Sequence, residues 1–124
     1  MTKVVCGVIR SEKGYLIAQK KDSLLWEFPG GKIQDGETCN QALIREIKEE
    51  INLDIEPLFE ITRYDYHKYT LIFIEGIVSG EDFIKLQEHE SVKWIELNEI
   101  SQYTFVDGEK KFLDHIILKN QEER

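Results

Sequence analysis

The chain has 124 residues, of which 41% are hydrophobic, and its formal net charge is -8. This length suits one domain, residues 1–124, with a single core. The negative charge argues against sequence-independent binding of DNA or RNA, because such binding needs many lysines and arginines against phosphates. A phosphate-bearing ligand would therefore need a metal ion between itself and the carboxylates. Without a run long and apolar enough for a membrane span or a secretory signal, the sequence predicts a cytoplasmic protein.

The N-terminal part predicts two strands and an irregular segment. Residues 3–10 and 15–20 are expected to pair as a hairpin, because a polar turn ending in Gly14 joins them. Residues 21–26 predict a loop. The run from Phe28 to Gly31 is expected to continue neither regular structure, since proline lacks an amide donor and paired glycines lose much entropy on ordering.

Residues 38–51 predict an amphipathic helix. Thr38 is a suitable N-cap, and Asn52 a suitable left-handed C-cap. Apolar residues recur three and four positions apart, which predicts a stripe that faces the core. The stripe consists of Leu43, Ile44, Ile47 and Ile51.

The remaining segments predict three strands and a last helix. Residues 56–66, 69–78 and 92–97 are rich in β-branched and aromatic side chains, and residues 108–119 have helical apolar spacing. Strands and helices interleave without a strict βαβ rhythm. This order favours an α+β fold in which a mixed sheet is packed between helices.

The two cysteines carry no chemical signature. Cys6 and Cys39 have neither the CxxC spacing nor the histidine cluster of a zinc site. We expect a buried thiol at Cys6 and a helix-start residue at Cys39.

The predicted helix carries a patch of glutamates. Glu46, Glu49 and Glu50 fall within an arc of about 100°, roughly opposite the apolar stripe. Like charges at these spacings destabilise an isolated helix by about 0.2 to 0.5 kcal/mol per pair, so the patch does not help the helix to form. Two interpretations remain at this point: a solvated acidic face, or a site for a hard cation such as Mg²⁺.

The residues around this patch form a longer pattern, residues 31–53, hereafter the box. A glycine is followed after five residues by Glu37, and after seven more by the run from Arg45 to Leu53, with glutamates at its second, fifth and sixth positions. This pattern resembles the signature of the Nudix hydrolase family, whose fold is an α/β/α sandwich. Asn52 stands where the family pattern has glycine, a mild departure because asparagine tolerates the left-handed conformation.

The resemblance implies roles for the box and for a glycine before it. The helix carboxylates Glu46, Glu49 and Glu50 would bind Mg²⁺, for which Mn²⁺ can substitute, together with a backbone carbonyl near Gly30. Glu46 or Glu49 could also take the proton of the attacking water. The supports of the site would be Arg45, Glu37 and Gly31.

Outside the box, Glu88 precedes Trp94 by six positions. It looks like the loop glutamate that many MutT-type members bring to the metal. Two interpretations of Glu88 are open: a metal ligand or general base, and a solvated charge on a loop. The neighbouring His89 is expected to be a surface residue rather than a ligand.

The run from Trp26 to Lys32 is similar to that of the MutT-type branch, nucleoside triphosphate pyrophosphohydrolases. Phe28 would line a base pocket or pack in the core, and Lys20 would reach a phosphate or remain a surface charge. Asp107 stands where that branch often has a residue that reads the base, although it also suits an N-cap. An ionised aspartate only accepts hydrogen bonds, which favours the amino group of cytosine or guanine.

The resemblance therefore implies Mg²⁺-dependent hydrolysis of a nucleoside triphosphate to a monophosphate and pyrophosphate, with a CTP-like, dCTP-like or oxidised guanine substrate. The expected partner is this small nucleotide, without nucleic acid or membrane, and the protein would be a monomer or a homodimer. Alternatives are another Nudix branch, acting on ADP-ribose or dinucleoside polyphosphates, and a nucleotide-sensing module without catalysis. Lys68 and Tyr69 occupy the region where ADP-ribose members tend to carry proline, which disfavours that branch.

Overall fold

The computed structural model describes residues 1–81 and 83–122, with side chains as far as residue 117. Two α-helices, two 3₁₀ helices and seven strands make up this described part. In chain order they are β1 (Thr2–Ser11), β2 (Gly14–Lys20), β3 (Trp26–Glu27), β4 (Gly30–Lys32), α1 (Cys39–Ile51), β5 (Ile55–Tyr66), β6 (Tyr69–Val78), β7 (His89–Ile95), η1 (Leu97–Gln102), η2 (Asp107–Glu109) and α2 (Lys110–Glu122).

The strands form one mixed sheet. Its main order is β3-β2-β1-β6-β5, while β4 pairs with β1 and β7 pairs with β2. The β1 and β6 strands are parallel, and the other pairings are antiparallel. The predicted hairpin of β1 and β2 is present, but the two strands pair only beside the turn, at Arg10↔Tyr15 and Ser11↔Gly14.

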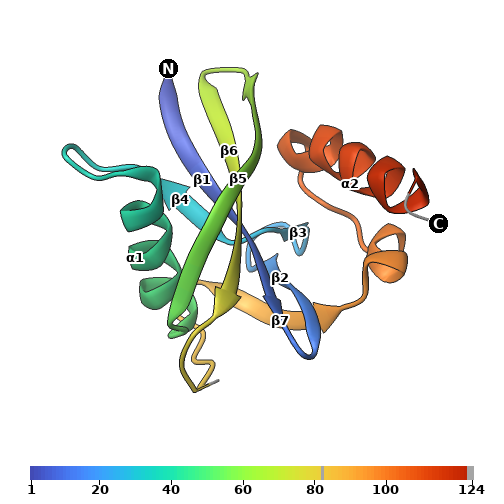
Figure 1. The fold of residues 1–124 in the computed structure, drawn as a ribbon, viewed down its shortest axis with the longest axis horizontal. Coiled ribbons are helices and arrows are strands. Elements are labelled where there is room, and N and C mark those ends of the chain that lie inside the picture. Colours follow the sequence, from blue (N-terminus) through green and yellow to red (C-terminus); the bar gives the residue numbers. More distant parts are fainter. Residues whose placement is uncertain (82, 123–124) are drawn as a thin grey trace.

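Two apolar clusters lie on the two faces of this sheet, because successive side chains of a strand point to opposite faces. Val5 and Ile9 of β1 pack in the cluster that contains the buried apolar residues of α1. Cys6 and Val8 pack in the other cluster, which contains Phe112 of α2. Figure 1 shows α1 and α2 on opposite sides of the strands. The expected α/β/α sandwich is therefore confirmed.

The α1 helix has the predicted caps. The Thr38 hydroxyl accepts a hydrogen bond from the Gln41 amide, and the Gln41 side chain accepts one from the Thr38 amide, forming a capping box. Asn52 has φ 64° and ψ 36°, the left-handed conformation expected of a C-cap. Leu43, Ile47 and Ile51 are fully buried, whereas Ile44 is 43% exposed, so its place in the buried stripe was wrong.

The segment after Phe28 departs from the prediction. Gly30–Lys32 form a short strand, β4, whose Gly30 lies opposite Cys6 of β1. A Cβ atom at Gly30 would lie 1.9 Å from the carbonyl oxygen of Val5. The close approach of the β4 and β1 backbones explains why residue 30 is a glycine. Local sequence propensities cannot predict this approach, because the two strands are distant in sequence.

The C-terminal elements are shifted from their predicted bounds. β7 begins at His89 rather than at residue 92, and α2 begins at Lys110 after the 3₁₀ turn η2. Cys6 is buried and Cys39 is the first residue of α1, as predicted. Within the described residues, no helix is long and apolar enough to cross a membrane.

Candidate active site

Arg45 ties the loop before α1 to the glutamates of the helix. Its Nε and Nη2 atoms donate to the two carboxylate oxygens of Glu37 at 2.7 and 2.9 Å, a bidentate pair. Its Nη1 atom donates to Glu46 at 3.1 Å and to Glu49 at 3.3 Å. Nη2 also donates to the carbonyl oxygen of Lys32 at 3.1 Å. One guanidinium thereby fixes the loop and two of the predicted metal ligands.

The same contacts set the charge of Glu37. The Arg45 hydrogen bond, assisted by the Gln34 amide, lowers the pKa of Glu37 to about 2. The Glu37 carboxylate in turn raises the pKa of Arg45. Both groups are thus held in their charged forms, as expected of a support for a cation site.

Glu50 lies in a different environment from its neighbours. It is 5% exposed, and its Oε2 atom has no hydrogen-bond partner among the described residues. Burial, followed by the hydrogen bond with Glu88 and the charge of Glu46, raises the pKa of Glu50 to about 10. Burial also raises the pKa of Glu46. These carboxyl groups fit a hard divalent cation, which would replace the proton and satisfy the buried oxygen.

One of the two interpretations of the glutamate patch, a solvated acidic face, does not hold for Glu50, because this residue is buried. The amide of Gln87 donates to the Glu50 carbonyl at 3.0 Å, and the amide of Lys85 donates to the Ile51 carbonyl at 2.8 Å. The loop before β7 is therefore fastened across the end of α1 and covers Glu50. Glu49, in contrast, has a side chain that is 60% exposed.

A cavity of about 290 Å³, the carboxylate cavity, lies beside Glu50. The structure brings Glu88 to it, as the metal or base role requires, and also His89, which is 4% exposed and so not the predicted surface residue. No three side chains of the described residues are already gathered as a formed metal centre. The lining residues are Lys20, Lys21, Asp22, Glu27, Glu50, Glu88 and His89.

A second cavity of about 420 Å³, the apolar cavity, lies on the α2 side of β1. Phe28 lines it and also packs against Phe105 and Phe112, with ring centroids 5.3 and 5.4 Å away, so both interpretations of Phe28 hold. Its other lining residues are Val4, Val5, Cys6, Lys20, Glu27, Gly30, Gly31, Lys32, Tyr66, Tyr69, Leu71, Val106, Gly108 and Glu109.

Glu109 is a polar residue of this cavity to which the sequence analysis assigned no role. It is 5% exposed, and its Oε1 atom accepts a 2.7 Å hydrogen bond from the Phe28 amide. Burial raises the pKa of Glu109 well above its usual range, although the Phe28 amide and Lys20 oppose this rise. Glu109 precedes the buried Phe112 by one helical turn, so a glutamate on an apolar face was the available signal.

Asp107 does not line the apolar cavity, which corrects its predicted position. Its side chain is 74% exposed and pairs with Lys110 at 2.8 Å, and this pairing lowers its pKa. It is the first residue of η2, whose N-cap is Val106, so it is not the predicted N-cap either. The tight 3₁₀ turn presents Glu109, and not Asp107, to the sheet.

The two cavities meet at Lys20 and Glu27, which line both. Lys20 is half-buried and faces the site, rather than being a free surface charge. Gly31 also has a place here, since a Cβ atom on it would lie 2.5 Å from the carboxyl carbon of Glu46. The glycine allows the β4 backbone to approach the helix carboxylates.

The sequence pattern and the fold both match one known family. The NUDIX domain model matches residues 1–116. The chain belongs to the Nudix family. It is therefore a Nudix hydrolase, an enzyme that acts on phosphoanhydride bonds, and its relatives support the MutT type.

Curated relatives agree with this assignment. The 8-oxo-dGTP diphosphatase of Buchnera aphidicola is 34% identical over 110 residues, which cover 84% of each chain. The CTP pyrophosphohydrolase of Escherichia coli is 26% identical over 121 residues, and the match covers 92% of this Nudix chain and 90% of the relative.

Solved structures share the fold. The Escherichia coli ORF135 protein has a TM-score of 0.79 at 24% identity and covers all of this chain and 93% of its own. A MutT structure from the work on Aliivibrio salmonicida and Vibrio cholerae has a TM-score of 0.76 at 24% identity, covering 95% and 98%.

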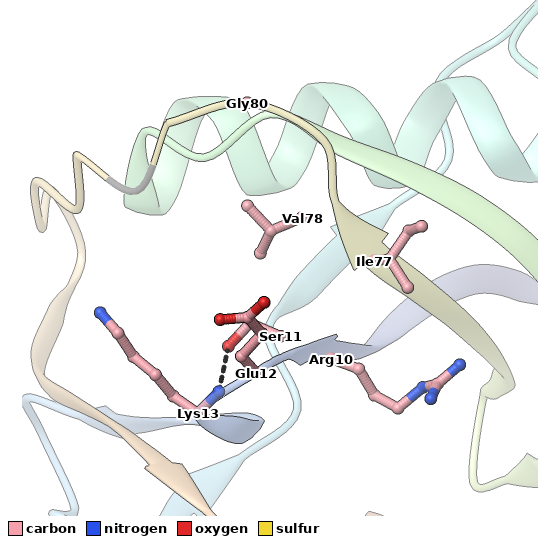
Figure 2. Close-up of a pocket in the computed structure, with 7 residues that line it drawn as sticks. All are labelled: Arg10, Ser11, Glu12, Lys13, Ile77, Val78 and Gly80. Atoms are coloured by element: carbon pink, nitrogen blue, oxygen red, sulfur yellow. Dashed lines mark hydrogen bonds between the residues drawn. The ribbon is translucent and has the colours of Figure 1, made fainter.

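A third hollow of about 500 Å³ lies away from the box, at the β1–β2 turn and the end of β6 (Figure 2). Its walls contain no box residue. Within it, the Lys13 amide donates to the Ser11 hydroxyl at 3.0 Å, and the Arg10 side chain pairs with Glu75 at 3.0 Å.

Proposed function

We propose that this Nudix hydrolase is a Mg²⁺-dependent pyrophosphohydrolase of nucleoside triphosphates in the cytoplasm, with oxidised guanine or cytosine nucleotides as substrates. It would release a monophosphate and pyrophosphate, and so cleanse the nucleotide pool. The observation that carries the proposal is the meeting of a carboxylate-lined and an apolar cavity at Lys20 and Glu27. A nucleotide has two matching parts, charged phosphates that bind a metal held by carboxylates and a flat base that suits an apolar cavity. The activities named for the Buchnera and Escherichia coli relatives support this substrate class.

At the phosphate end, the residues proposed to bind Mg²⁺ are Glu46, Glu49, Glu50 and Glu88, with the Gly30 carbonyl. When bound, the ion neutralises phosphate charge and lowers the pKa of a coordinated water. Arg45 holds the carboxylates of Glu46 and Glu49 in place, and either one can accept the proton of the attacking water. Lys20 adds a positive charge where the phosphates enter.

At the base end, Glu109 is the proposed reader of the base. Because burial raises its pKa, the neutral carboxyl group can donate one hydrogen bond and accept another. In 8-oxoguanine, the O6 acceptor lies beside an N7–H donor, whereas guanine has two acceptors there. Cytosine likewise offers N3 as an acceptor beside its N4 amino donor. A neutral carboxyl group therefore pairs with both proposed bases, and Phe28 supplies an apolar wall.

The test is a screen for phosphate release in Mg²⁺ with dCTP, CTP, 8-oxo-dGTP, dGTP, ADP-ribose and diadenosine tetraphosphate. We expect pyrophosphate from 8-oxo-dGTP or the cytosine nucleotides, with activity abolished by EDTA. Glu49→Gln should lower kcat by orders of magnitude with an unchanged circular dichroism spectrum, whereas Glu56→Gln, an exposed control, should not. Turnover of ADP-ribose or the dinucleotide alone would refute the proposed substrate class.

A variant pair tests the base reader. Glu109→Gln keeps one donor and one acceptor and should retain the preference for 8-oxo-dGTP over dGTP, or for the cytosine nucleotides. Glu109→Leu removes both and should lose about tenfold or more of that preference, the usual cost of a buried hydrogen-bonding group. Equal preferences in the two variants would exclude Glu109 as the reader.

A further inference from the structure

Glu27 and His89 form a part-buried polar pair at the junction of the two cavities. The Nε2 atom of His89 lies 2.8 Å from Oε2 of Glu27, and their side chains are 3% and 24% exposed. The two residues come from β3 and β7, which flank β2. Their partners on β2 are Ala18 for Glu27 and Lys20 for His89, with a register shift between Gln19 and Lys20.

The burial of the His89 ring costs free energy, which calls for a reason. The Nδ1 atom of His89 is buried with no hydrogen-bond partner among the described residues. Apolar residues at these positions would avoid this cost. Glu27 is also a negative charge close to the other acidic groups, since it raises the pKa of Glu50, of Glu109 and of Cys6. A merely structural role does not account for such a carboxylate.

The position of Glu27 limits what it can bind. If the base of a nucleotide occupies the apolar cavity and its phosphates reach the carboxylate cavity, the sugar lies between them. Lys20 and Glu27 are the residues shared by the two cavities. Lysine suits a phosphate, while a carboxylate accepts hydrogen bonds from donors. The hydroxyl groups of the sugar are the donors that a nucleotide offers at this point.

We propose that Glu27 binds the sugar hydroxyl groups of the nucleotide and that His89 is the positioning residue that fixes its carboxylate. The hydrogen bond from His89 engages Oε2 of Glu27, and Oε1 is the second acceptor of the carboxylate. A carboxylate held on one side by a buried ring is preorganised to accept on the other. This inference rests on the proposed function, because it needs a nucleotide across both cavities.

The experiment compares nucleotides that differ only in the sugar. Dissociation constants of dCTP and dGTP, and of their 2′,3′-dideoxy counterparts, are measured by calorimetry in Ca²⁺, so that binding does not depend on turnover. In Glu27→Ala we expect the Kd values of the deoxynucleotides to rise about tenfold, the usual loss for a hydrogen bond to a charged group, with little change for the dideoxynucleotides. Glu56→Ala, on the exposed side of β5, is the matched control.

His89 is tested with two variants. His89→Gln keeps an N–H donor and should retain most of the preference for deoxy over dideoxy nucleotides, whereas His89→Leu should lose it. In a Glu27→Ala background, the His89→Leu change should have no further effect on this preference, because the residue acts through Glu27. If His89→Leu destabilises the protein, the deoxy-over-dideoxy preferences of His89→Gln and Glu27→Ala test the proposal without it.

Equal losses for deoxy and dideoxy nucleotides in Glu27→Ala would overturn the proposal. Equal losses with a weaker affinity for Mn²⁺, measured by electron paramagnetic resonance, would assign Glu27 to the metal instead. If the wild-type protein binds and hydrolyses dCTP or dGTP but Glu27→Ala keeps the sugar preference, this inference fails and the proposed function stands. If no nucleotide binds to the wild-type protein, both fail.

Discussion

Replacing Glu50 by glutamine should stabilise the metal-free protein. Glu50 is 5% exposed, one of its oxygens has no partner among the described residues, and its pKa is raised from 4.5 to about 10. At neutral pH, the folded protein therefore keeps this carboxyl group protonated, whereas the unfolded chain releases the proton. Glutamine has nearly the same shape and does not titrate, so the variant avoids this pH-dependent cost.

The size of the effect follows from proton linkage. Because the folded pKa is raised, the stability that Glu50 contributes is fully present below pH 4.5 and is lost as the pH rises toward 10. Above 4.5 the slope of the loss rises toward about 1.4 kcal/mol per pH unit, and the loss summed from 4.5 to 7 is roughly 3 kcal/mol. This figure depends only on the folded pKa lying above 7. It is a large part of the usual stability of a small domain.

Urea unfolding in EDTA between pH 5 and pH 8 measures this effect. The free energy of unfolding of Glu50→Gln should exceed that of the wild type by a margin that grows by about 1.4 kcal/mol per pH unit. Added Mg²⁺ should raise the melting temperature of the wild type more than that of the variant, since the variant lacks an ionisable ligand. Parallel pH curves for the two proteins would refute the assignment of a raised pKa to Glu50.

Two further predictions concern the supports of the site. Gly31→Ala should lower kcat at least tenfold while the protein stays folded, because its Cβ atom would lie 2.5 Å from the Glu46 carboxyl carbon. Gly30→Ala should instead destabilise the fold, because its Cβ atom would lie 1.9 Å from a β1 carbonyl oxygen. Steady-state kinetics and thermal melting of both variants check this, and equal changes of kcat and melting temperature in the two variants would contradict it. Since the pKa of Glu37 is lowered to about 2, its contribution to stability is present above pH 4.5 and is lost as the pH falls toward 2. Glu37→Gln should therefore weaken the acid dependence of unfolding in that range, and an unchanged acid transition would argue against the Glu37–Arg45 pair.

The α1 helix could be predicted from sequence because its signals are local. Thr38 and Asn52 cap it through contacts within one turn or through their own backbone conformation. The spacing of Arg45 and the helix glutamates also places them near one another without knowledge of the rest of the fold. The fold class followed from the alternation of strands and helices, which the sheet order confirms.

The missed features depend on contacts between distant segments. Glu50 is buried because the loop before β7 is fastened over the end of α1, and Glu109 is buried because its carboxyl group accepts from the Phe28 amide. His89 is buried through Glu27 on another strand. Glu50 and His89 are polar residues in polar stretches of sequence, so composition predicts that they are exposed, and only the arrangement of the sheet reveals their burial. For Glu109, the spacing from Phe112 was a local signal, but its partner Phe28 is distant in sequence.

The two buried carboxyl groups suggest how an acidic protein accommodates an anionic substrate. Glu50 lines the carboxylate cavity and Glu109 lines the apolar cavity, and burial raises the pKa of both. The raised pKa values lessen the negative charge that these two groups present to a nucleotide. Glu50 has an oxygen without a partner among the described residues, which a cation could bind in exchange for the proton, whereas Glu109 already accepts from a backbone amide. In the proposed function, the same residue type would therefore serve the phosphates in one cavity and the base in the other, and the groups that contact each carboxyl would decide between the two roles.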